Sequence, residues 1–295
     1  PGHGQHNQHC KWYYTKLEGT CQGNDVEFLQ KKWYNFNMKN FHTHTKRCRH
    51  ATGEDEEYVL SAIKNGFDEI GFSDHAPMLF PQECGYYSGF RMFPEDAEDY
   101  VKSIRFLKNK YKDKIKIHLG FELEYYPDLF RKELNYLKGF DIDYLILGQH
   151  YIHNEYDNQG HYNALPTDNE NVLKEYVSQC LEGLRTGAFT YLAHPDILNF
   201  TGDEKKYKKE MQKLCAGAKA LAIPLEFNFL GFVDKRTYPR DDFWKIAAET
   251  GNEVILGLDA HTPKFFAMKE QIEEMKKHLA SLGITPITNL TIKKP

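Results

Sequence analysis

The sequence predicts an α/β fold in which parallel strands alternate with helices and close into a barrel. From Met38 onward, short apolar stretches alternate with longer amphipathic ones seven times, which is typical of parallel strands joined by right-handed helical crossovers. Histidines and carboxylates follow the apolar stretches, and such barrels carry their functional residues at the C-terminal ends of the strands. No glycine-rich phosphate loop interrupts the series, which argues against a doubly wound nucleotide-binding sheet.

Length and charge limit the possible functions. The 295 residues fit one barrel of roughly 250 residues plus an extension. A net charge of −4 and the absence of basic runs argue against a nucleic-acid partner. We therefore expect a small-molecule partner.

The cysteines and the apolar stretches bear on the compartment. The six cysteines are scattered, without a C-x-x-C pair, which is typical of reduced cytosolic thiols rather than of disulfides. No apolar run in the sequence reaches the roughly 20 residues of a membrane span, and no charged-then-apolar signal opens the chain. We expect a cytoplasmic protein with no membrane partner, and the sequence leaves its oligomeric state open.

Residues 1–37 differ from the rest of the chain. They show no sustained period of 2 or 3.6, and their polar opening carries His3, His6 and His9. Met38 stands just before the first apolar stretch. We therefore expect the natural start at Met38, residues 1–37 as a poorly ordered or adventitious extension, and residues 38–295 as the catalytic domain.

The first units of the barrel are predicted from side-chain periodicity. A helix over 55–65 carries Val59 and Ile63 on one face, and Gly66 provides its C-terminal cap. A strand over 69–73 follows. The next elements are, in order, a helix over 94–111 opened by proline and acids, a strand over 116–121, a helix over 128–138 and a buried strand over 143–147.

The second half continues the alternation. The long polar stretch 151–168 is predicted to be a loop, and Val172, Tyr176 and Cys180 mark the core face of a helix over 169–186. The remaining elements are a strand over 190–193, a helix over 205–220, a strand over 223–228, a helix over 241–250, a strand over 253–258, a helix over 264–282 and a weak terminal strand near 286–291.

The residues at the strand ends form a candidate metal site. His42 and His44 lie on one face of an extended chain because side chains repeat every two residues, and the following loop can bring His50 back toward them. Imidazoles and carboxylates without a thiolate suit Zn, Mn or Fe. Each ion takes about three or four protein ligands, so two or three divalent ions are implied, with Glu122 as the natural bridge. The full set is His42, His44, His50, His75, Glu122, His150, His194, Asp259 and His261.

The order of these residues resembles that of the polymerase and histidinol phosphatase (PHP) family, in particular its histidinol-phosphate phosphatase branch, over nearly all of residues 38–295. The stretches that carry the resemblance are His42-Thr-His44-Thr, Cys48-Arg-His50-Ala-Thr-Gly53, Gly71-Phe-Ser-Asp-His-Ala-Pro77, Gly120-Phe-Glu122, Gly148-Gln-His150, Ala193-His-Pro195 and Leu258-Asp-Ala-His-Thr-Pro263. Residues 1–37 have no counterpart in it.

The resemblance implies a distorted, seven-stranded (β/α)7 TIM-like barrel with a trinuclear metal site. It assigns three sets of ligands, which are His42, His44, Glu122 and Asp259 for the first metal, Glu122, His150 and His194 for the second, and His50, His75 and His261 for the third. It also implies a phosphatase that hydrolyses L-histidinol phosphate to L-histidinol and phosphate, a late step of histidine biosynthesis.

The chemistry of such a site agrees with phosphate-ester hydrolysis. Divalent ions neutralise the phosphate oxygens and lower the pKa of bound water from about 16 toward 7. A hydroxide that bridges two metals would attack phosphorus in line, without a covalent intermediate. We expect Glu122, Asp259 and His261 to be catalytic, with Asp259 the first candidate to protonate the leaving oxygen.

Basic residues outside the metal ligands are candidates for substrate binding. Arg91 follows the second strand and Arg236 the sixth, and a bidentate guanidinium suits a phosphate. A solvated surface position is the alternative for each arginine. His153 and His161, in the long fourth loop, are weaker candidates.

Two other functions remain open from the sequence. A phosphoesterase of the same family could act on nucleotides or on another small phosphate monoester, because loops rather than the fold set specificity. A non-catalytic metal-binding barrel belongs to a different class and would lack some of the ligands. All nine ligand positions are filled here.

Overall fold

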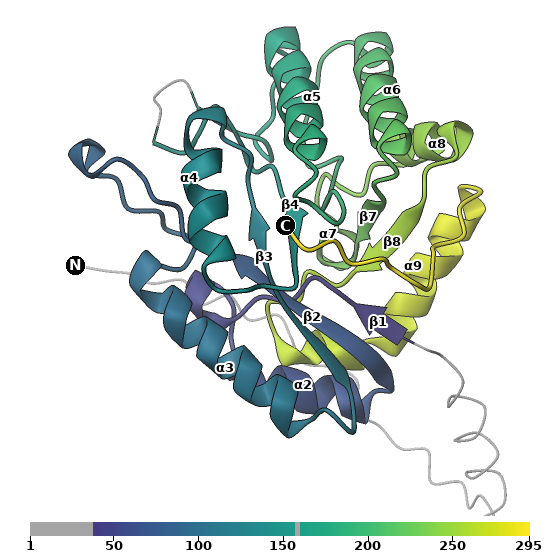
Figure 1. The fold of residues 1–295 in the computed structure, drawn as a ribbon. Helices are drawn as coiled ribbons and strands as arrows, with labels where there is room; N and C mark the ends of the chain where they lie inside the picture. Colours follow the sequence, from purple (N-terminus) through teal and green to yellow (C-terminus); the bar gives the residue numbers. More distant parts are fainter. Residues whose placement is uncertain (1–37, 157–159) are drawn as a thin grey trace, which may run out of the picture. The chain divides into compact units, whose positions relative to one another are not determined.

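Seven extended segments form the centre of the computed structural model, which describes residues 38–156 and 160–295 (Figure 1). The expectations for residues 1–37 lie outside the described residues. Four strands follow one another in a parallel sheet, β1 (Met38–Asn40), β2 (Phe67–His75), β3 (Lys116–Leu123) and β4 (Tyr144–Leu147). Two more strands pair in parallel, β7 (Leu225–Asn228) and β8 (Val254–Gly257).

Backbone bridges join the two groups of strands into a ring. On one side, Leu192 forms parallel bridges to Leu147 at the end of β4 and to Leu225 at the start of β7. On the other side, the His44 N–H donates to the Ala260 carbonyl at 3.0 Å. The predicted barrel of parallel strands is confirmed, with residues 190–193 in the fifth place as isolated bridges rather than as a regular strand.

The longer helices follow the strands and lie outside the ring (Figure 1). Residues at the helix ends fix several boundaries. The Asn169 side chain accepts a hydrogen bond from the Asn171 N–H at 2.9 Å at the start of one helix, and the left-handed backbone of Gly251, with a φ of 74°, ends another. The helices are α2 (Asp55–Lys64), α3 (Ala97–Lys110), α4 (Pro127–Lys138), α5 (Glu170–Arg185), α6 (Glu204–Ala220), the short α7 (Phe229–Val233), α8 (Asp241–Thr250) and α9 (Lys269–Ser281).

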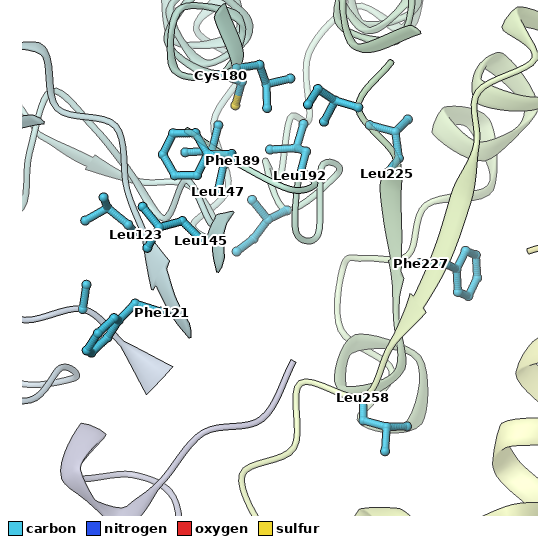
Figure 2. Packing of buried hydrophobic residues seen from close by; sticks show 14 of the residues in the cluster. Phe121, Leu123, Leu145, Leu147, Cys180, Phe189, Leu192, Leu225, Phe227 and Leu258 are labelled. Atoms are coloured by element: carbon cyan, nitrogen blue, oxygen red, sulfur yellow. The ribbon is translucent and has the colours of Figure 1, made fainter. Parts of the chain in front are cut away.

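The apolar side chains alternate between two clusters, as the period of a strand requires. In β4, Tyr144 and Ile146 belong to a small inner cluster, whereas Leu145 and Leu147 pack outward against the helices. Figure 2 shows the outer cluster, in which Leu147 lies close to Cys180 of α5.

Two glycines make room for the inner cluster. A Cβ atom at Gly71 would lie 2.2 Å from the Tyr144 hydroxyl oxygen, and one at Gly120 would lie 2.5 Å from the Tyr144 ring. Larger side chains at these positions of β2 and β3 would therefore displace Tyr144 from the barrel interior. The Tyr144 hydroxyl donates to the Phe41 carbonyl at 2.7 Å, which holds the ring below the site.

Four predicted elements were wrong in part. The segment near 286–291 is not a strand, because only Ile287 donates to the barrel backbone, and Leu290 and Ile292 pack on the inner cluster instead. The loop 151–168 contains a short antiparallel pair, β5 (Tyr151–Ile152) and β6 (His161–Tyr162). The helices predicted over 94–111 and 264–282 begin with 3₁₀ turns, η3 (Pro94–Asp96) and η4 (Pro263–Ala267).

None of the helices in the described residues is long and apolar enough to cross a membrane.

Candidate metal centre

The nine predicted ligands converge at the C-terminal ends of the barrel strands. His75 is the last residue of β2 and is paired in register with Glu122 of β3. His194 and Asp259 follow the fifth and last extended segments, and each has a left-handed backbone with φ values of 29° and 50°. Such conformations are costly for residues other than glycine and cluster at functional sites.

Glu122 lies at the centre of this group. The carboxylate is buried, with 1% of its surface exposed. A Cβ atom at position 148 would lie 1.9 Å from its Oε1 atom, so Gly148 is needed to make room for it. Its two oxygens lie between 2.8 and 3.6 Å from ring nitrogens of His194, His75, His42, His44 and His150.

The ligand atoms fall into several close groups. Within each group the candidate atoms lie within 4.8 Å of one another. The groups are His42, His44 and Asp259; His42, Glu122 and His194; His44, His75 and Glu122; and His50, His75 and His261. A further group joins His44 and His261 to Cys48, a buried thiol that the sequence analysis did not select.

Several buried nitrogen and oxygen atoms of the nine ligands lack a hydrogen-bond partner in the part of the chain that the structure describes, which shows whether divalent ions would fit the site. His42 Nε2, His44 Nε2, His75 Nδ1 and Glu122 Oε2 are buried and have no hydrogen-bond partner among the described residues. Leaving such an atom unpaired costs about 1–3 kcal/mol. A divalent ion accepts a lone pair from imidazole and carboxylate alike. The residues present therefore fit a cluster of divalent metal ions.

In several of these histidines, the second ring nitrogen lies within hydrogen-bonding distance of a backbone carbonyl. His50 Nδ1 lies 2.9 Å from the Cys48 carbonyl, and His261 Nδ1 lies 3.0 Å from the Asp259 carbonyl. A proton on Nδ1 leaves the Nε2 lone pair free to bind a metal.

Two carboxylates hold further rings in the same way and were missed in the sequence. Glu226 Oε2 lies 2.7 Å from His42 Nδ1, and Glu124 Oε1 lies 2.8 Å from His150 Nδ1. The available signal was a glutamate inside the apolar strand over 223–228 and a Glu-x-Glu pair at the end of the third strand.

The carboxylates and imidazoles shift one another's pKa values. Burial disfavours a charge on His42, but Glu226, Asp259 and Glu122 outweigh that effect and raise the pKa of His42 to about 10. Burial likewise favours a neutral Glu122, but His150, His75 and His42 hold the pKa of its carboxyl group well below the usual range. These carboxylates therefore favour positive charge at His42 and next to Glu122. At His75 and His261 burial lowers the pKa instead, so these two rings favour the neutral form that can bind a metal ion.

A cavity of about 490 Å³ opens onto the cluster. Its floor includes His50, His75, His150, Asp259 and His261, and its walls carry Phe90, Tyr151, Tyr162, Tyr238 and Arg236. Among the described residues, the guanidinium of Arg236 donates only to the Tyr238 hydroxyl and the Asp234 carboxylate, each at 3.2 Å. Arg236 thus lines the same cavity as the cluster, and its expected role in substrate binding stays a prediction.

The other candidates for substrate binding lie elsewhere. Arg91 is 1% exposed and donates to Ala76, Glu124 and Glu155, so its guanidinium has no donor left for a phosphate. The prediction that Arg91 binds phosphate is therefore corrected. The sequence could not show this, because the residues that enclose Arg91 are distant from it in the chain. His153 lies 3.3 Å from Glu175, and neither His153 nor His161 lines the cavity.

Comparison with known proteins points to one family. The sequence model of the PHP domain matches residues 40–228. A Deinococcus radiodurans protein named "Probable histidinol-phosphatase" is 29% identical over 239 residues, which are 75% of this chain and 85% of that protein. A protein from Lactococcus lactis named "Histidinol-phosphatase" is 27% identical over 76% of this chain and 84% of its own length.

A solved structure has the same fold. It is the crystal structure of histidinol phosphate phosphatase from Lactococcus lactis, complexed with Zn, L-histidinol and phosphate. The two structures superpose with a TM-score of 0.68 and 20% sequence identity, over 88% of this chain and 99% of that chain.

Proposed function

The chain belongs to the PHP domain family, and on this premise we propose that it is a metal-dependent phosphatase that hydrolyses L-histidinol phosphate to L-histidinol and phosphate. The observation that carries the proposal is the buried carboxylate of Glu122, which is surrounded by imidazoles next to a cavity that also holds Arg236. The names of the curated relatives support the substrate.

The metal content follows from the ligand groups. We propose two to three divalent transition metal ions, with zinc as one candidate beside manganese and iron. One ion would be held by His42, His44, Asp259 and Glu122, the second by Glu122, His150 and His194, and the third by His50, His75 and His261. When bound, the ions neutralise the phosphate oxygens and lower the pKa of water.

Asp259 is the proposed proton carrier of the reaction. Its carboxylate borders the cavity, and Oδ1 lies 3.0 Å from His44 Nε2 and 3.3 Å from His261 Nδ1. The ionised carboxylate would accept a proton from the attacking water and return it to the leaving oxygen.

The cavity walls would recognise the rest of the substrate. The Arg236 guanidinium would bind phosphate oxygens, because it is part-exposed toward the cavity and makes only two polar contacts among the described residues. The rings of Phe90 and Tyr151 lie 5.9 Å apart and nearly parallel. They offer an aromatic wall to the imidazole group of histidinol phosphate.

A phosphate-release screen tests this function. The metal-loaded protein is assayed with L-histidinol phosphate, amino-alcohol phosphates without an imidazole, sugar phosphates and nucleotides. We expect the highest kcat/KM for L-histidinol phosphate. A higher kcat/KM for a nucleotide or a sugar phosphate would replace the proposed substrate, and no phosphate release from any ester would favour a non-catalytic barrel.

A further inference from the structure

A buried chain of charged groups leads from Arg91 to His150. Glu124 Oε1 lies 2.8 Å from His150 Nδ1. The same carboxylate accepts hydrogen bonds from both ends of the Arg91 guanidinium, with Nη2 at 2.8 Å from Oε1 and Nη1 at 2.9 Å from Oε2. Arg91 and Glu124 are each 1% exposed. Water therefore does not compete for these contacts, and the position of one group fixes the next.

The contact from Glu124 decides which nitrogen of His150 faces the cluster. A carboxylate beside Nδ1 keeps the proton there and leaves the lone pair on Nε2. His150 Nε2 lies 3.6 Å from Glu122 Oε1, on the side of the other ligands. Glu124 thus presents His150 to the second proposed metal site in the tautomer that can bind an ion.

Arg91 fixes Glu124 and ties three strand ends together. Besides Glu124, which follows β3, it donates to the Ala76 carbonyl after β2 at 3.1 Å and to Glu155 beyond β5 at 2.7 Å. The guanidinium carbon lies 4.5 Å from the centre of the Phe90 ring. That ring contacts His150 in turn, with 5.8 Å between the ring centres. The arginine therefore supports His150 both through Glu124 and through Phe90.

We propose that Arg91 and Glu124 are positioning residues that set the tautomer and orientation of His150, and thereby the metal affinity of the site that His150 serves. The proposal rests on the metal centre of the proposed function and is independent of which phosphate ester is hydrolysed. It replaces the phosphate-binding role that the sequence suggested for Arg91.

Variants of the pair separate positioning from general stability. Glu124→Gln keeps the size of the side chain but lacks the charge that holds both Arg91 and the His150 proton. Arg91→Lys keeps the charge but cannot bind both Glu124 oxygens. Glu133→Gln is the matched control for the loss of a nearby buried carboxyl group. Glu133 is also fully buried, accepts a hydrogen bond from the Leu79 N–H and interacts electrostatically with Arg91 and Glu124, but it touches none of the proposed ligands. His150→Gln removes the supported ligand itself.

The first readout is metal affinity, measured by titrating each folded variant with zinc against a chelator of known affinity. Loss of a carboxylate that supports a ligand histidine typically weakens metal binding ten- to a hundredfold. We expect about that loss at one site in Glu124→Gln and a smaller loss in Arg91→Lys. Glu133→Gln should bind as the wild type does. Wild-type affinity in both Glu124→Gln and Arg91→Lys, with metal lost in His150→Gln, would overturn the proposal while leaving the metal centre intact.

The second readout is the nitrogen-bound proton of His150 in the zinc-loaded protein labelled with 15N-histidine. We expect a downfield Nδ1–H resonance that is absent from His150→Gln and shifted in Glu124→Gln and Arg91→Lys, but not in Glu133→Gln. An unshifted resonance in Glu124→Gln would show that the carboxylate does not hold the ring. Full metal content in His150→Gln would overturn the assignment of His150 as a ligand and this proposal with it.

Discussion

His50 Nε2 and His261 Nε2 lie 2.8 Å apart, although 211 positions separate the two residues in the sequence. The Nδ1 atom of each ring lies against a backbone carbonyl, that of Cys48 or that of Asp259. With protons on both Nδ1 atoms, two lone pairs face each other, and they repel unless a cation lies between or beside them. Burial favours the neutral form and lowers the pKa values of both histidines, which keeps these lone pairs available.

Replacing His50 with alanine tests this pair. His50→Ala removes one ligand from the group that also contains His75 and His261. We expect the loss of about one metal equivalent and a fall in kcat of at least about a hundredfold, which corresponds to about 2.7 kcal/mol in the barrier. Metal analysis and steady-state kinetics measure the two effects. Unchanged metal content with more than a tenth of the wild-type kcat would argue against the group.

Removal of the metals should abolish the reaction. We expect two to three equivalents of transition metal per chain, a complete loss of phosphate release after chelation, and recovery when a divalent ion is returned. The physical reason is that the phosphate oxygens are not neutralised without the ions. A preparation that is fully active with one or no metal ion would contradict the multinuclear site.

Arg236 should act on the substrate and not on the metals. Arg236→Ala removes a charge-assisted hydrogen bond worth about 1.5–3 kcal/mol, so we expect kcat/KM to fall about ten- to a hundredfold at unchanged metal content. Arg240→Ala is the control, since Arg240 donates to the Phe200 carbonyl and its guanidinium lies over the Tyr207 ring, outside the cavity. Equal effects of the two changes would contradict the role of Arg236.

The buried carboxyl group of Glu133 should make the free energy of unfolding depend on pH. Burial raises the pKa of this carboxyl group from 4.5 to about 7. The folded state therefore holds the proton more tightly than the unfolded state, and stability falls as the pH rises between these values. Glu133→Gln removes this loss, and the variant should gain up to about 3 kcal/mol over the wild type between pH 4.5 and pH 8. Denaturant unfolding of both proteins across this range measures the difference, and a constant difference would contradict the raised pKa.

The metal ligands could be predicted from the sequence where they lie close together in the chain, directly after a strand. His42 and His44 follow the first strand, Asp259 and His261 follow the last, and the alternation of strands and helices brings such ends together. That is why the ligands could be selected from the order of residues in the chain.

The supporting residues could not be predicted because their partners are distant in the sequence. Glu226 meets His42 across 184 positions. Arg91 resembles an exposed loop cation until Glu124 and Glu155, 33 and 64 positions away, enclose it. The prediction of a strand near 286–291 was wrong for a similar reason. The apolar side chains of Ile287, Leu290 and Ile292 suggest a strand, but they pack against the inner cluster of the barrel.

The replacement of Glu122 by glutamine tests the central claim most directly. A neutral amide has nearly the same shape, but it should weaken the hold on both ions that Glu122 is proposed to bridge. Glu69→Gln is the control, because Glu69 of β2 is a buried carboxylate paired with Lys39, Lys116 and His118, none of which is a proposed ligand, so its loss should lower stability and leave kinetics unchanged.

The measurement is the metal content and kcat of Glu122→Gln, made where circular dichroism shows the variant folded. We predict that its metal content falls below that of the wild type and that kcat drops far more than tenfold, with Glu69→Gln unchanged in both. A folded Glu122→Gln protein with its full metal complement and more than a tenth of the wild-type kcat, a loss of less than about 1.4 kcal/mol in the barrier, would show that Glu122 is not the centre of the site.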